Sequence, residues 1–102
     1  MFSLNMKYKS KVVFTKKGDL KYISHLDLIR LFSRAIRRSG LPFFVTEGFS
    51  PHLKIILKRA LKLGVESELE EAEFVFKTPV NPQILKENLN SQLPEGIIIK
   101  DV

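Results

Sequence analysis

The order of strand-like and helix-like segments is the feature that most constrains how this chain can fold. Residues 6–15 alternate between two faces with a period of two, which is typical of a strand with one buried face. Residues 24–39 instead repeat their apolar positions every three or four residues, as an amphipathic helix does. Ser24 is a good capping residue for that helix, and Gly40 is a good residue to end it.

The remainder of the chain continues the same alternation. Short β-rich or apolar segments are predicted to be strands at residues 43–46, 53–58, 71–77 and 97–99. Asn81 and Pro82 open a second helix, because proline is compatible with the first helical turn. The apolar face of this second helix comprises Ile84, Leu85 and Leu89.

This order predicts an α+β domain with a ferredoxin-like βαββαβ arrangement, an antiparallel sheet with two helices on one face. The segment at residues 43–46 is an extra short strand in this scheme. A length of 102 residues fits one domain, which we place at residues 6–102 after a disordered lead, residues 1–5.

The composition excludes several classes of function. The chain has no cysteine, so it has no disulfide, no thiolate metal site and no cysteine nucleophile. It has no apolar run typical of a signal peptide or a membrane span, and we therefore expect a cytoplasmic protein that does not enter membranes. Its histidine spacing matches no metal-binding signature, so neither a metal nor a cofactor is predicted.

The net charge of +6 is unevenly distributed along the chain. Residues 1–62 contain 14 basic and 3 acidic residues, whereas residues 63–102 contain 3 basic and 8 acidic ones. The two halves either form a polarised surface or neutralise each other in the fold. The neighbouring faces of the first strand and of the strand at residues 71–77 favour local pairing, through Lys7, Lys9 and Lys11 on one and Glu71 and Glu73 on the other.

The first helix carries a row of arginines opposite its apolar side. Leu28, Ile29, Phe32, Ala35, Ile36 and His25 fall on the apolar side, and the opposite side holds Arg30, Arg34, Arg37 and Arg38. Guanidinium groups match phosphate oxygens, so this row is a candidate polyanion-binding surface. The alternative is a solvated helix face, with Asp27 paired to Arg30.

Two histidines are the candidate catalytic residues. If residues 43–46 are the second strand, the loop that follows them lies at the same sheet edge as the start of the first helix. His25 and His52 would then be neighbours, and Ser24 and Ser50 would add polar groups for binding. Two imidazoles can serve as general acid and base, or contact phosphate. His25 has the alternative of a partly buried structural role, and Phe49 is expected to anchor the loop in the core.

Several motifs resemble one bacterial family. These are Gly18-Asp19-Leu20, Tyr22 to Leu28, Arg34-Ala35, Arg37-Arg38, Gly40-Leu41-Pro42, Gly48 to His52 and Gly64 to Ser67. In this order they resemble the radical-SAM-linked protein family. The resemblance implies a domain fused to, or encoded beside, B12-binding radical-SAM proteins, in an RNA-linked setting, with no established activity or catalytic residues.

The resemblance also implies that the chain corresponds to the N-terminal half of a family domain about twice its length. The chain departs from the family pattern at residues 59–62, where many members carry a Pro-Leu-type turn. It also departs at Glu71 and Glu73, where members often carry an aromatic residue and an aspartate. The resemblance therefore does not imply, for this chain, a site that needs that aspartate or the other half of the family domain.

These observations lead to three functional hypotheses. The first is a non-catalytic module that binds RNA or another phosphate-bearing ligand through the arginine row and the histidine edge. The second is an enzyme or a radical-SAM accessory subunit that uses the two histidines in RNA processing or modification. The third is a protein-interaction domain, for example a homodimer formed through an exposed sheet edge.

Overall fold

The computed structural model describes residues 7–60 and 62–102. The predicted disordered lead, residues 1–5, lies outside the described residues. In chain order, the elements are β1 (Tyr8–Lys16), the short 3-10 helix η1 (Gly18–Tyr22), α1 (His25–Ser39), β2 (Ile55–Leu57), β3 (Ser67–Phe76), α2 (Pro82–Asn90) and β4 (Ile99–Asp101).

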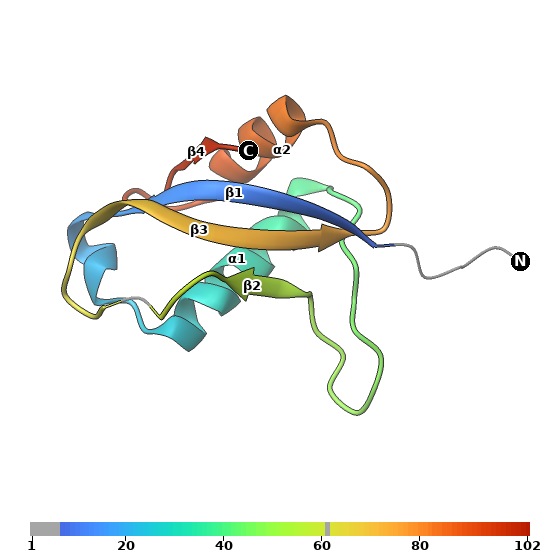
Figure 1. Ribbon diagram of the computed structural model, residues 1–102, viewed down its shortest axis with the longest axis horizontal. Helices are drawn as coiled ribbons and strands as arrows, with labels where there is room; N and C mark the ends of the chain where they lie inside the picture. The colour runs from blue at the N-terminus through green and yellow to red at the C-terminus, as the bar shows by residue number, and fades with distance from the viewer. Residues whose placement is uncertain (1–6, 61) are drawn as a thin grey trace, which may run out of the picture.

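The strands form one sheet in the order β2-β3-β1-β4, and every neighbouring pair is antiparallel. Figure 1 shows β1 and β3 running side by side along the length of the molecule, with β2 and β4 at the edges. Because β1 and β2 are both antiparallel to β3, they run parallel to each other and α1 connects them. This arrangement confirms the predicted ferredoxin-like fold.

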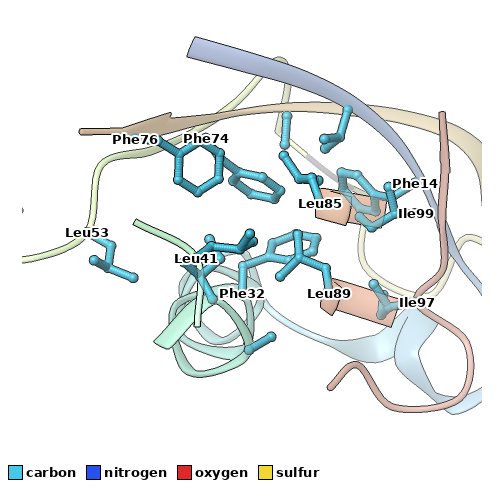
Figure 2. Close-up of a cluster of buried hydrophobic side chains, with 14 of the residues drawn as sticks. Phe14, Phe32, Leu41, Leu53, Phe74, Phe76, Leu85, Leu89, Ile97 and Ile99 are labelled. Carbon is cyan, nitrogen blue, oxygen red and sulfur yellow. The ribbon is translucent and has the colours of Figure 1, made fainter. Parts of the chain in front are cut away.

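The core lies between the sheet and the two helices (Figure 2). Phe32 of α1 packs edge-to-face against Phe14 of β1, with ring centroids 5.0 Å apart, and against Phe74 of β3 at 5.3 Å. From α2, Leu85 and Leu89 are completely buried in the same cluster. Truncation of a buried phenylalanine to alanine typically costs about 3–5 kcal/mol, so this cluster holds the helices against the sheet.

The helix ends follow the sequence signals. The Ser24 hydroxyl accepts a hydrogen bond from the Asp27 backbone N–H at 3.1 Å, which satisfies one donor of the first turn. Gly40 ends α1 with a φ of 79°, a left-handed conformation in which glycine has no Cβ penalty. Asn81 caps α2 by accepting from two backbone N–H groups.

The segment at residues 43–46 is not a regular strand, and the structure differs there from the expectation. Phe43 forms a single bridge with Phe76, the last residue of β3, and Val45 forms a single bridge with Leu53. In this antiparallel register the residues after Phe43 would continue along β3 toward Phe74, but Phe74 already pairs with Ile55 of β2, so the segment turns away from the sheet. Residues 43–53 thus form an irregular hairpin that precedes β2.

Candidate functional site

A groove of about 530 Å³ lies between α1 and the chain that enters β2. One side of the groove is formed by α1, through Leu26, Ile29, Arg30, Ser33 and Arg34. The other side is formed by His52 and Leu53 of the hairpin and by Ile55, the first residue of β2. Leu53 is buried and Ile29 and Ile55 are partly buried, whereas the arginines and His52 are exposed. The groove therefore combines apolar walls with basic side chains, and it brings His52 together with two members of the predicted arginine row.

The four arginines of α1 have different surroundings. Arg30 lies 3.5 Å from Asp27, but both side chains are 62% exposed, and such a surface pair contributes little to stability. Arg37 stacks over the Phe43 ring at 5.3 Å. Within residues 7–60 and 62–102, Arg34 and Arg38 form no ion pair, and both are exposed. The row is therefore open to a ligand, with Arg34 inside the groove.

The hairpin holds His52 in a defined orientation. The backbones of Thr46 and His52 are linked by a 2.9 Å hydrogen bond, and the His52 N–H donates to the Thr46 hydroxyl at 3.2 Å. The His52 Nδ1 lies 2.8 Å from the Ser50 carbonyl oxygen. Because a carbonyl oxygen only accepts, this contact is a hydrogen bond in the tautomer that carries its proton on Nδ1. In this tautomer Nε2 is the ring nitrogen that a ligand can reach.

Phe49 is fully exposed at the tip of this hairpin, which corrects the expectation that it anchors the loop in the core. The Thr46–His52 closure explains the difference, because it makes residues 47–51 project beyond the packed part of the fold. Figure 1 shows the loop between α1 and β2 extending away from the sheet. An exposed aromatic ring on the hairpin that also contributes His52 to the groove is a candidate platform for base stacking.

The structure does not bring His25 together with His52. His25 is the first residue of α1, is exposed, and does not line the groove. The expectation failed because the loop comes before β2 and not after it. As β2 runs parallel to β1, its start lies at the end of the sheet opposite the one where β1 finishes and α1 begins. The geometry thus gives no support to a two-imidazole acid–base pair.

The basic and acidic halves of the chain meet in the sheet. Lys11 lies directly opposite Glu73 on β3, although Lys9 lies opposite Val75. Lys7 instead sits over the Phe44 ring at 5.2 Å, and Lys17 pairs with Glu68. The acidic β3 thus offsets the charge of β1, whereas α1 keeps its positive charge.

Sequence reasoning missed a charged cluster at the far end of β1. Glu70 of β3 is 3% exposed and accepts two hydrogen bonds from the Arg59 guanidinium, at 2.9 and 2.8 Å. These bonds lower the pKa of Glu70, against the opposing effect of burial. Lys16 is 1% exposed nearby. The sequence did contain a signal for the burial of Lys16, because this residue continues the core-facing alternation of Val12 and Phe14.

The described part of the chain contains neither a cluster of metal-ligating residues nor a membrane-spanning helix. Among residues 7–60 and 62–102, no three histidine, aspartate or glutamate side chains come close enough together to hold a metal ion. No helix in those residues has the length and apolar character needed to cross a membrane.

The comparisons with known proteins give a family but no activity. The family model described as "Uncharacterized protein conserved in bacteria (DUF2344)" matches residues 9–102, which include every strand and helix except the first residue of β1. No curated protein and no solved structure matches the chain. Since the match covers almost all of the sequence, the chain belongs to this conserved bacterial family.

Proposed function

We propose that this domain is a non-catalytic module that binds single-stranded RNA in the groove between α1 and the hairpin. The observation that carries the proposal is the combination of Arg34 and His52 in one groove with a fully exposed Phe49 in the same hairpin as His52. Single-stranded nucleic acid offers both phosphates and unpaired bases, which are the two kinds of group that such a surface can hold.

The proposed binding surface makes two kinds of contact, ionic contacts to phosphates and stacking contacts to bases. Arg34 and Arg38, which have no carboxylate partner among the described residues, supply the electrostatic attraction to phosphates. Arg30 exchanges a weak solvent-exposed contact with Asp27 for a phosphate at little cost. Phe49 and the apolar walls of the groove accept a base, because every base has a face that stacks on an aromatic ring.

The same geometry disfavours catalysis by this domain alone. His52 has no second imidazole or carboxylate beside it in the groove, since the groove residues include no acid and do not include His25. A general acid–base pair on a phosphodiester needs two such groups at one scissile bond. In this proposal the Nε2 of His52, the acceptor nitrogen in this tautomer, accepts a hydrogen bond from a ribose 2′-OH or a base N–H group and does not transfer a proton.

The resemblance to radical-SAM-linked proteins suggests where the module acts. It would hold RNA for a radical-SAM partner that performs the chemistry. Co-elution of this domain with a B12-binding radical-SAM protein of the kind that the resemblance implies, in a gel-filtration experiment, tests that partnership. Light scattering of the isolated domain tests the separate prediction of a homodimer.

The proposal is tested by fluorescence anisotropy with a labelled single-stranded RNA oligonucleotide at two salt concentrations. The double variant Arg30→Gln/Arg34→Gln should weaken binding by about tenfold or more and reduce the salt slope by roughly 1.4, since two phosphate contacts are lost. The matched control is Lys9→Gln/Lys11→Gln, which removes the same charge from the open sheet face and should change affinity only slightly.

Equal losses in the two double variants would contradict the proposal, because they would mean that net charge alone attracts RNA. Absence of RNA binding at low salt would also contradict it. If the groove variants instead abolished binding of an acidic protein segment while RNA did not bind, the groove would be a protein-docking site, which is the competing hypothesis.

A further inference from the structure

A second hollow lies at the other end of β1 and shares no lining residue with the groove. It has a volume of about 310 Å³, near the lower limit for small-molecule pockets of roughly 300–1,000 Å³. The end of β1, the segment before β3 and the start of β3 all contribute to it, through Lys16, Arg59, Ala60, Lys62, Val65, Glu66, Ser67 and Glu70.

Lys16 is the unusual residue of this pocket. Lysine is almost never fully buried without a partner, yet Lys16 is 1% exposed on the core-facing side of β1. Its ammonium group donates to the Lys62 carbonyl oxygen at 2.6 Å, and in the described residues no carboxylate forms an ion pair with it. A carbonyl satisfies one of three N–H donors and does not neutralise the charge.

The two acidic residues of the pocket, Glu66 and Glu70, accept hydrogen bonds from other groups, although the Glu70 carboxylate also interacts electrostatically with Lys16. Both oxygens of Glu70 accept from Arg59, which fixes the segment before β3 against the sheet. Glu66 accepts from the backbone N–H of Gly18 at 2.7 Å and so closes the turn after β1. Lys62 is exposed and makes no ion pair among the described residues.

The pocket therefore presents more positive charge than its own carboxylates offset. Lys16 supplies a buried ammonium group that the fold holds in place, and the exposed Lys62 is a second basic lining residue. Ala60 and Val65 also line the pocket and give it apolar surface. We propose that this pocket binds the anionic head group of a small molecule, a phosphate or a carboxylate, with the Lys16 ammonium as its principal donor.

This inference is independent of the proposed RNA groove, and its test uses different residues. The domain, labelled with ¹⁵N, is titrated with inorganic phosphate and separately with acetate at constant ionic strength. Saturable shifts are expected for the backbone amides of residues 16–18 and 62–67, with a Kd of about 1 mM or tighter for the preferred anion. The stronger of the two responses identifies phosphate or carboxylate as the head group.

Three variants separate a binding site from a structural lysine. Lys16→Met keeps the length of the side chain and should weaken anion binding about tenfold or more. Lys62→Met keeps the backbone carbonyl that Lys16 contacts, and should weaken binding by a smaller factor even if Lys16→Met fails to fold. Lys9→Met lies on the same strand but on the open face, and it should leave anion binding unchanged.

Two results would overturn the proposal. One is the absence of saturable shifts at residues 16–18 and 62–67 with both anions. The other is wild-type anion affinity in both Lys62→Met and a folded Lys16→Met variant, which would mean that Lys16 only ties the chain segment to β1.

Discussion

The two hollows of this domain hold similar basic residues in opposite ways. In the groove, Arg34 is exposed and forms no ion pair among the described residues. At the other end of β1, Arg59 is bound to Glu70 through two hydrogen bonds, and Lys16 is buried. The comparison teaches that the position of the carboxylates, and not the number of cations, decides which positive charge can meet a ligand.

Removal of the Glu70 charge should give the largest effect. Glu70→Gln leaves the buried Lys16 ammonium without its nearby negative charge and removes the ionic partner of Arg59. We expect a loss of about 2–4 kcal/mol in the free energy of unfolding, less than for a completely buried pair because Arg59 is 68% exposed. Urea denaturation followed by circular dichroism measures it. A loss of only about 0.5 kcal/mol, as for an ordinary surface substitution, would contradict this description of the cluster.

Phe49→Ala should separate binding from stability at the other end of the domain. The ring is fully exposed, so the free energy of unfolding should change by no more than about 0.5 kcal/mol. RNA affinity should fall by about 1–3 kcal/mol if a base stacks on the ring. Thermal denaturation and anisotropy measure the two quantities on the same sample. Unchanged RNA affinity would remove Phe49 from the binding surface.

The pH dependence of stability should come partly from the Glu70 cluster. The pKa of Glu70 is lowered from 4.5 by its hydrogen bonds with Arg59, so folding favours the ionised carboxylate. This contribution is complete above the unfolded pKa and is lost as the pH falls through the folded pKa. The stability gap between wild type and Glu70→Gln should therefore be constant near neutrality and shrink below about pH 4.5. A gap that widens on acidification would be inconsistent with this sign.

Asp27→Asn should have the smallest effect and mark the contrast with Glu70. Its ion pair with Arg30 is exposed on both sides, so we expect a change of less than about 0.5 kcal/mol in unfolding free energy. Asparagine keeps a polar side chain in the first turn of α1, and the Ser24 cap uses the backbone N–H of residue 27, which remains. RNA affinity should rise slightly, because a negative charge near the groove is removed. Chemical denaturation and anisotropy check both outcomes.

Local patterns in the sequence predicted the framework of the fold well. The period of two in β1 and the capping residues Ser24 and Asn81 depend on neighbours a few positions apart, and these elements formed near the predicted bounds. The strand β3 begins at Ser67, several residues earlier than predicted, because β1 is long enough to pair with its acidic start. Cross-strand pairing of this kind is decided by tertiary contacts.

The candidate site was harder to predict, for two physical reasons. The segment at residues 43–46 has β-rich composition, but β3 offers it only one position, at Phe76, and this moved the His52 loop away from His25. The second reason is that side-chain type is a poor guide to burial at individual positions. Phe49 is apolar and exposed, whereas Lys16 is charged and buried, because backbone geometry determines where each side chain points.

The most direct measurement is a map of backbone amide shifts as a single-stranded RNA oligonucleotide is added to the ¹⁵N-labelled domain. We expect the largest shifts in the α1 turns that carry Arg30 and Arg34 and in residues 46–55 of the hairpin, with little change on the open sheet face around Lys9 and Lys11. Shifts concentrated on that sheet face, or spread evenly over all exposed lysines, would contradict a binding groove between α1 and the hairpin.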